Sequence, residues 1–260
     1  MSRLTRELAG LGVTLRDSVR LWRLAPLVPL VAVLPELAQH AVEIRLGMFA
    51  SQEAFASLAL DPQRLALGGI KIAALVLAVL AGARFWANRT AGLRGWSLAG
   101  IAWKQVLLGL GVQIVVSLRA LLDLRVAPMV QLTLSFVLTL ASLPGLVLMV
   151  GGLLGDNETG LLAIYRSGWT KALRILLHIG PVWLLLQVLH RADHIAALDR
   201  PIWLVWLLMV LDALVVGQMA SLAATGLHHG YRGEEACTES LNLYACLLYT
   251  SPSPRDKRQS

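Results

Sequence analysis

Apolar stretches of close to 20 residues recur along the chain, separated by short breaks that carry charged residues. Such stretches are typical of membrane-spanning α-helices, because the hydrocarbon core of a bilayer is about 30 Å thick and a helix rises about 1.5 Å per residue. The expected fold is therefore all-α, a polytopic transmembrane helical bundle of about six spans. The predicted spans are residues 24–42, 65–87, 98–118, 129–154, 173–189 and 201–224.

The composition excludes an ordinary soluble domain. Hydrophobic residues make up 57% of the chain and charged residues 15%, whereas soluble domains carry about 25% charged residues. The expected partner is therefore the lipid bilayer, with protein partners or self-association in the membrane as further options. The net charge of +7 requires no nucleic acid, because cationic loops beside anionic lipid account for it.

The distribution of Lys and Arg predicts the orientation. One alternate set of segments between the spans, which includes the N-terminal segment, holds twelve of these residues and the other set holds six. Cationic loops are retained in the cytoplasm, so both termini are expected there. Arg greatly outnumbers Lys, a usage typical of GC-rich bacterial genomes, and the expected location is the bacterial inner membrane.

Three tryptophans mark an internal repeat. Trp22, Trp96 and Trp169 are 74 and 73 residues apart, and each precedes a pair of predicted spans. This spacing predicts three copies of one unit, an amphipathic elbow helix followed by a transmembrane hairpin. The alternative is three interface anchors that arose independently. The repeat units would cover roughly residues 1–87, 88–154 and 155–240 of a single membrane domain, 1–245.

The C-terminal residues are treated separately. Cys246–Asp256, with the sequence CLLYTSPSPRD, resembles a translated sequencing adapter, so we interpret residues 246–260 as a non-native tail. The remaining cysteine, Cys237, cannot form an internal disulfide. The residues that follow the sixth predicted span, His228 and His229 among them, are expected to form an irregular cytoplasmic tail.

The segment Leu161–Leu176, LLAIYRSGWTKALRIL, resembles YciC-like bacterial inner-membrane proteins. In that group a cytoplasmic elbow before a hairpin carries an Arg-Ser-Trp phrase followed by Thr and a basic residue. Gly168 is inserted in the phrase here and departs from that pattern. The resemblance covers about sixteen residues and implies a six-helix membrane fold without an established chemistry.

Four ionisable residues fall inside the predicted spans, where a charge is costly and is usually paired or functional. Glu36 and Lys71 lie at matching depths in consecutive antiparallel spans, so we expect a buried ion pair. Asp212 could pair in the same way with Lys104, unless the lysines extend to the interface. Such pairs would fix helix register, whereas the alternative is that the four residues line an ion or proton path.

Candidate metal ligands recur at helical spacing near the predicted periplasmic side. They are His40 and Glu43, which follow Glu36 in the first span, and His190, Asp193 and His194 at the end of the fifth. Imidazole and carboxylate suit a first-row metal ion, and the alternative is that these groups are simply solvated at the membrane surface. The tail residues that suggest the same chemistry are His228, His229, Glu234, Glu235 and Cys237.

Signatures of common enzyme families are absent from the sequence. It contains no Gly-x-Ser-x-Gly, no HExxH, no P-loop and no dinucleotide fingerprint, so no catalytic residues and no cofactor are expected. Short loops favour a non-catalytic protein that organises or maintains the envelope. A small transporter or channel subunit using the four intramembrane ionisable residues is the alternative, and a lipid-modifying enzyme using the acid and His groups ranks third.

Overall fold

The chain is all-α in a computed structural model that describes residues 3–118 and 128–233, with no strand in these ranges. Five helices are long and apolar enough to cross a membrane. They are α2 (Leu27–Arg45), α4 (Pro62–Thr90), α6 (Pro128–Leu154), α8 (Trp169–Ala197) and α9 (Ile202–Arg232). The third predicted span corresponds to the shorter apolar helix α5 (Trp103–Leu118). The remaining elements are α1 (Arg3–Leu24), the 3-10 turn η1 (Met48–Ala50), α3 (Gln52–Ser57) and α7 (Leu161–Ser167).

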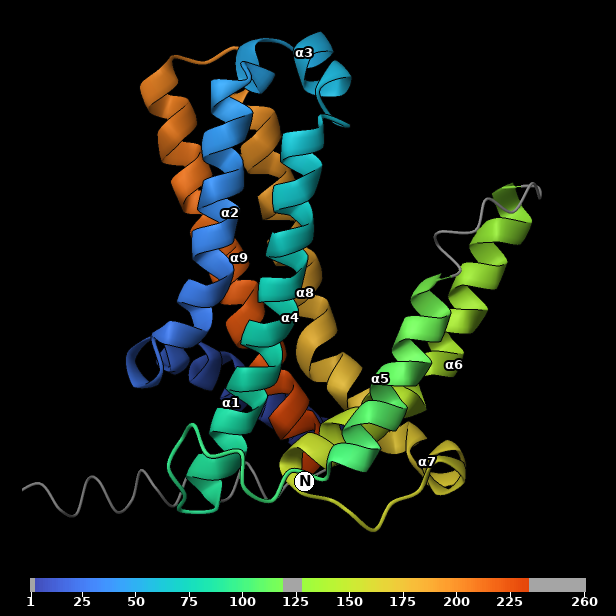
Figure 1. Cartoon of the computed structure of the whole chain (residues 1–260). Coiled ribbons are helices and arrows are strands. Elements are labelled where there is room, and N and C mark those ends of the chain that lie inside the picture. Colours follow the sequence, from blue (N-terminus) through green and yellow to red (C-terminus); the bar gives the residue numbers. More distant parts are fainter. Residues whose placement is uncertain (1–2, 119–127, 234–260) are drawn as a thin grey trace, which may run out of the picture.

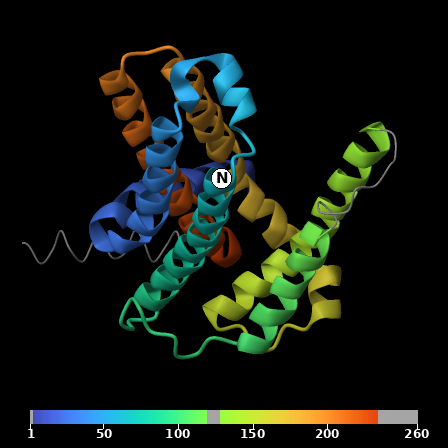
Figure 2. The same ribbon diagram turned by 45° about the horizontal axis from the view of Figure 1, so that its top comes forward.

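Helices α2, α4, α8 and α9 form the main bundle, and the α5–α6 hairpin leans away from it (Figures 1 and 2). We call the end of the bundle that holds residues 46–61 and 198–201 the α3 end. The opposite end, called the α1 end, holds α1, residues 91–102 and the last turn of α9 (Figure 1). Both ends of the described chain therefore lie on one side of the bundle.

Small residues allow the central helices to approach closely. A Cβ added to Gly82 of α4 would lie 2.6 Å from Cβ of Ala224 in α9. A Cβ added to Gly217 of α9 would lie 2.5 Å from Val33 of α2 and 2.8 Å from the Trp22 ring. Small residues serve this purpose in membrane bundles because close backbones increase van der Waals contact without help from water. Helix α9 is thereby held against both α2 and α4.

Helix α9 continues past the end of the predicted sixth span, which corrects the interpretation of its last residues. His228 and His229 were expected in an irregular tail, but both lie within α9 and are buried. The side chain of His229 lies 3.0 Å from Asp17 of α1, so tertiary contacts stabilise these polar turns as helix. Glu234, Glu235, Cys237 and residues 246–260 lie outside the described residues.

The elbow helix expected in the second repeat unit is absent, which is a second correction. Residues 91–102, where Trp96 lies, form turns, whereas Trp22 lies in α1 and Trp169 begins α8. Gly92 and Gly100 have positive φ values of 67° and 76°, which interrupt a helix. Carbonyl groups of this segment accept hydrogen bonds from Arg84 and Asn88 of α4 instead. The three hairpins α2–α4, α5–α6 and α8–α9 are present, but a repeated elbow helix is not.

The arrangement predicts that the C-terminus and residues 46–61 lie on opposite sides of the membrane. Alkaline phosphatase, which is active only after export, would be fused to the C-terminus of the full chain or inserted at Gln52. One of the two fusions should be active and the other inactive. An insertion at Glu158, in the α6–α7 connection, serves as a control and should match the C-terminal fusion. Equal activity of the Gln52 and C-terminal fusions would contradict the six-crossing arrangement.

Candidate functional site

Charged and polar side chains from four helices meet inside the bundle near the α3 end. Helix α2 carries several of them on one face, because positions three and four apart in a helix are neighbours. Asp212 of α9 lies opposite that face. The members of this cluster are Glu36, Gln39, His40 and Glu43 of α2, Arg64 and Lys71 of α4, His190 and His194 of α8, and Asp212 of α9.

The carboxylate of Asp212 is fully buried and faces three imidazoles. Its Oδ2 atom lies 2.8 Å from Nε2 of His40 and 3.5 Å from Nε2 of His194. Its Oδ1 atom lies 2.6 Å from Nδ1 of His190. Residues of α2 and α8 that are far apart in the sequence therefore converge on one acidic group.

The orientation of His40 is set by a second carboxylate. Nδ1 of His40 lies 2.9 Å from Oε2 of Glu43. Arg64 and Gln39 each donate a hydrogen bond of 2.8 Å to Oε1 of Glu43, which makes Glu43 an acceptor. The Nδ1 atom of His40 therefore carries the proton that binds Glu43, and in the neutral ring Nε2 presents a lone pair to Asp212.

Glu36 is fully buried and only partly satisfied. Lys71 donates a hydrogen bond of 2.8 Å to Oε1 of Glu36, so the pair expected from their matching depths is present. The same oxygen lies 3.4 Å from Nε2 of His40. Oε2 of Glu36 and Nδ1 of His194 are buried and have no hydrogen-bond partner among the described residues. Such atoms are costly to bury, and a further group bound between them would reduce that cost.

The ligand atoms are close enough together to hold a metal ion. His40, His194 and Asp212 each offer one such atom, and the three lie within 4.8 Å of one another. Glu36, His190 and Asp212 form a second group by the same measure. A tetrahedral ion bound at about 2.0–2.1 Å separates its ligands by about 3.3 Å, so small side-chain shifts would complete either site. Nitrogen with carboxylate oxygen suits Zn²⁺ and its first-row neighbours better than Ca²⁺ or Mg²⁺.

The cluster is more open on its α8 side than on its α2 side. The side chains of His190 and His194 are 19% and 14% exposed, whereas those of His40 and Asp212 are fully buried. The His194 ring stacks on Phe49, with centroids 6.0 Å apart, and meets Phe55 edge to face at 6.2 Å. Aromatic walls therefore hold His194 at the entrance of the cluster.

The structure combines two sets of residues that the sequence kept apart. His40, His190 and His194 were expected as metal ligands, and they meet Glu36 and Asp212, which were expected as intramembrane charges. His190 and Asp212 both lie about ten residues from the short 198–201 connection that joins α8 and α9. They therefore lie at similar depths in the membrane, and a comparison of depths would have paired them. The depth signal that paired Glu36 with Lys71 was therefore also present in the α8–α9 hairpin.

Four of the expected ionisable site residues lie outside the two ligand groups, namely Lys71, which pairs with Glu36, and Glu43, Asp193 and Lys104. Glu43 contacts His40 from behind, and Asp193 is partly exposed on α8 and belongs to neither group. The expected pair of Lys104 with Asp212 was wrong. Lys104 is exposed on α5, which leans away from α9 with its hairpin partner, and Asp212 is paired with His40 and His190 instead.

Comparison with family models, with curated proteins and with solved structures gave no match to this chain. The resemblance of residues 161–176 to YciC-like proteins therefore stays a prediction.

The Glu36–Lys71 pair predicts an asymmetric double-mutant cycle. Lys71→Met leaves Glu36 buried without its cation and should destabilise the protein by about 3 to 5 kcal/mol. Glu36→Gln should cost less, because the Lys71 side chain is 24% exposed and reaches water. The double variant should recover part of the loss, with a coupling of about 0.5–3 kcal/mol.

Unfolding of the detergent-solubilised variants by denaturant, with a chelator present so that no metal ion compensates, measures these effects. Lys104→Met is the control, and it should change stability little because Lys104 is exposed on α5. Strictly additive losses would show that the two charges do not stabilise each other.

Proposed function

We propose that this integral membrane protein holds a divalent first-row metal ion, with Zn²⁺ as the reference ion, among His40, His194 and Asp212. The observation that carries the proposal is the convergence of these three ligand atoms within 4.8 Å inside the bundle. His190 and Glu36, which form the second group with Asp212, lie beside the ion without being among its three ligands. The cluster lies in the half of the bundle nearer the α3 end.

The charges of the cluster support a bound cation. Three carboxylates, those of Glu36, Glu43 and Asp212, stand against two fixed cations, Lys71 and Arg64. One negative charge is left over when the imidazoles are neutral, and an uncompensated charge in a membrane bundle is costly. A proton on one imidazole neutralises it. A divalent ion changes the net charge from −1 to +1, but it also uses the lone pairs of several imidazoles at once.

The contacts around His40 support the same ion. Metal-bound histidines usually donate their second ring N–H to a carboxylate, which fixes the ring and strengthens the ligand. Glu43 takes this role for His40, and Arg64 in turn holds Glu43 in place. Without a proton or a cation between them, the Nε2 lone pair of His40 and the Asp212 carboxylate would repel each other across 2.8 Å.

The packing below the cluster favours a resident ion over a transported one. Between Asp212 and the α1 end, α9 packs through Ala213, Val216, Gly217 and Ala220, which are buried against apolar neighbours. The chain of contacts from Lys71 through Glu36, His40 and Asp212 to His190 supports proton movement, but both of its ends lie in the same half of the bundle. A transporter or channel role is therefore the weaker hypothesis.

Two further expectations from the sequence are part of the proposal. We infer from the cationic bias that the α1 end faces the cytoplasm of a bacterial inner membrane, which would place the cluster toward the periplasm. A non-catalytic role in organising the envelope requires no ion. A metal-free protein with full cellular function would favour that role.

The metal proposal predicts about one Zn²⁺ per chain after purification in detergent and removal of loosely bound ions. Inductively coupled plasma mass spectrometry measures this content. His40→Ala, His194→Ala and Asp212→Asn should each lose the ion. Removing it from the unchanged protein with a chelator should lower stability, by about 2.7 kcal/mol relative to a free Zn²⁺ concentration of a hundred times Kd.

Asp193→Asn is the matched control, because Asp193 precedes His194 on the same helix but belongs to neither ligand group. It should keep the ion. Failure of the folded, unchanged protein to bind Zn²⁺ or another first-row ion at saturating concentration would exclude the proposal. Equal loss of metal from Asp193→Asn and Asp212→Asn would exclude the assigned ligands.

A second candidate function, metal-assisted hydrolysis, is favoured by the free Oε2 atom of Glu36. Three protein ligands leave one position of a tetrahedral ion open to water, whose proton a nearby carboxylate can accept. Oε2 of Glu36 is buried within the cluster and has no hydrogen-bond partner among the described residues. The more exposed α8 side would admit the bond to be cleaved.

This candidate predicts that Glu36→Gln keeps the metal ion bound by His40, His194 and Asp212 but loses hydrolytic activity. Release of nitrophenol from nitrophenyl esters of short fatty acids, in mixed micelles, is a direct assay. Activity should fall at least about a hundredfold, the usual contribution of a general base. Hydrolysis that survives both Glu36→Gln and a chelator would come from another source.

A further inference from the structure

A cavity lies at the α3 end, between the turn that follows α2 and the start of α9. Its volume is about 170 Å³. Apolar side chains form most of its wall, among them Ile44, Phe49, Ile202 and Val205. Among the lining residues, all within the described ranges, Arg200 in the connection between α8 and α9 carries the only charge. The cavity therefore combines an apolar surface with a single cation.

The apolar wall is part of the packed structure. The side chains of Phe49 and Val205 are buried and belong to one apolar cluster at this end of the bundle. The backbone N–H of Asp199 donates a hydrogen bond of 2.9 Å to the carbonyl of Phe49, which ties the α8–α9 connection to the turn after α2. Because side chains in a packed core interdigitate with few voids, the wall is formed before a ligand binds.

The Arg200 side chain is available to a ligand. It is exposed, and it forms no hydrogen bond or ion pair with another residue of the described ranges. Pro201 follows it and restricts the Arg200 backbone to extended conformations. A guanidinium can bind both oxygens of a carboxylate at once. The cavity therefore presents a binding group for one small anion beside an apolar wall.

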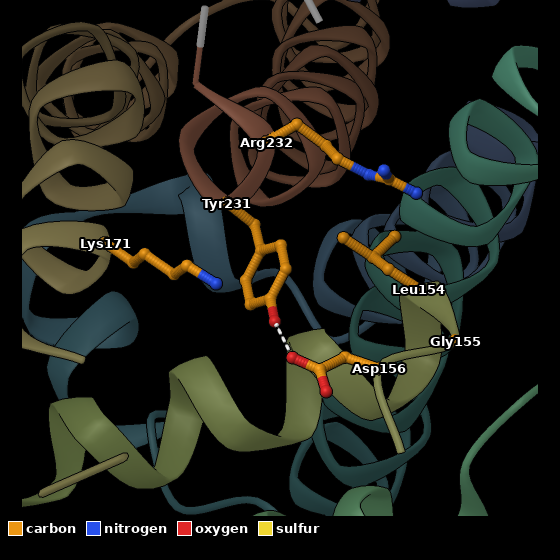
Figure 3. A pocket seen from close by; sticks show the side chains of 6 residues that line it. All are labelled: Leu154, Gly155, Asp156, Lys171, Tyr231 and Arg232. Atoms are coloured by element: carbon orange, nitrogen blue, oxygen red, sulfur yellow. Dashed lines mark hydrogen bonds between the residues drawn. The ribbon is translucent and has the colours of Figure 1, made fainter. Parts of the chain in front are cut away.

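The larger cavity at the α1 end is different, because its charged groups are engaged within the chain (Figure 3). Asp156 accepts a hydrogen bond of 2.6 Å from the Tyr231 hydroxyl. Nζ of Lys171 lies 3.9 Å from the centre of the Tyr231 ring, and Arg232 also has a partner in the chain. An unengaged cation therefore distinguishes the cavity that Arg200 lines.

The position of this cavity indicates that its ligand comes from the membrane. Trp203 and Trp206, in the first turns of α9, are exposed, and tryptophan is enriched at the interface between lipid and water. Ile202 at the cavity edge is followed on the same face of α9 by Trp206 and Val210, and all three are exposed. An apolar surface therefore runs from the cavity into the hydrocarbon.

We propose that this cavity binds the carboxylate end of a long-chain fatty acid. The carboxylate meets Arg200, the first carbons of the chain lie against Phe49 and Val205, and the rest of the chain follows the exposed face of α9. A cavity of about 170 Å³ is smaller than the roughly 300–1,000 Å³ of sites that enclose whole small molecules, so it takes only one end of the ligand.

The lining favours a fatty acid over a phospholipid. A phospholipid head group carries further polar groups, and an apolar wall would leave them without hydrogen-bond partners. A fatty acid has a small anionic group joined directly to an alkyl chain, which matches one cation beside an apolar wall. Phe49 also stacks on His194, so the cavity adjoins the metal cluster, but the two sites share no ligand. The fatty-acid site therefore requires no metal ion.

The test measures binding of palmitate to the full-length protein in detergent by native mass spectrometry. Hexadecanol, which has the same chain length without the charge, and phosphatidylglycerol are the comparison probes, and a chelator removes any metal ion. The unchanged protein should bind palmitate at least about tenfold more tightly than hexadecanol, because hydrogen bonds to a charged group are stronger than neutral ones. Arg200→Gln should remove that preference.

Three further variants separate binding from folding. Arg200→Lys keeps the charge and should keep part of the preference for palmitate. Ala50→Phe places a large side chain at an exposed position of the cavity wall, and it should weaken binding of both palmitate and hexadecanol. Arg191→Gln removes an exposed cation of α8 that does not line the cavity, and it should leave binding unchanged. Melting curves that match the unchanged protein show that the variants are folded.

The source of the ligand and the role of Arg200 are separated by the results. Palmitate binding that depends on Arg200 and not on Arg191 supports the site. Failure of the unchanged protein to bind palmitate, or equal binding by Arg200→Gln and Arg191→Gln, would overturn it. Binding of phosphatidylglycerol that depends on Arg200, without binding of palmitate, would replace the fatty acid with a phospholipid head group and so contradict the assignment.

Discussion

The carboxylate of Asp212 imposes the main constraint on the structure, because it is fully enclosed by helices that cross the membrane. A charge in such a setting needs partners, and lipid supplies none. His40 of α2 and His190 of α8 are those partners. The carboxylates of α2 in turn form ion pairs with Arg64 and Lys71 of α4. The register of the four helices at the α3 end follows from this one group.

Close packing in the rest of the bundle makes the arrangement of the cluster possible. Gly217 lies little more than one helical turn after Asp212 and lets α9 approach Val33 of α2, which brings the polar face of α2 within reach of Asp212. Gly82 allows the same approach between α4 and α9 farther along. Because membrane helices gain nothing from excluding water, this dense packing of small residues is what holds the polar groups at hydrogen-bonding distance.

The sequence predicted the features that depend on one helix or one hairpin. Apolar length located the spans, and depth alone paired Glu36 with Lys71, because consecutive spans joined by a short loop are neighbours. Depth failed for Lys104 and Asp212, since it does not say which helices are adjacent, and the α5–α6 hairpin leans away from α9. The metal cluster joins α2, α8 and α9, so it became visible only when the helices were placed in space.

The ends of the elements were predicted less well, for a related reason. His228 and His229 lie in polar turns, which predict an exposed tail when the sequence is considered alone. In the fold, however, the side chain of His229 contacts Asp17 of α1, which lies more than two hundred residues earlier in the chain. The segment around Trp96 resembles in sequence the segments around Trp22 and Trp169. Its carbonyl groups, however, accept hydrogen bonds from Arg84 and Asn88 of α4, which stabilise it as turns. In both places polar partners from a neighbouring helix outweighed the local pattern.

Two buried aspartates, Asp17 and Asp212, show how differently the same problem is solved at the two ends of the described bundle. Asp17, at the α1 end, is neutralised by Arg16 and Arg20 at 3.3 and 3.4 Å, together with His229. Guanidinium groups always carry a charge and do not bind metal ions, so this solution is complete in itself. Asp212 faces three imidazoles instead, and a neutral imidazole offers a lone pair in place of a charge. A site that only fixed helix register would be served better by arginine, so the choice of histidine around Asp212 favours a cation that arrives from outside the chain.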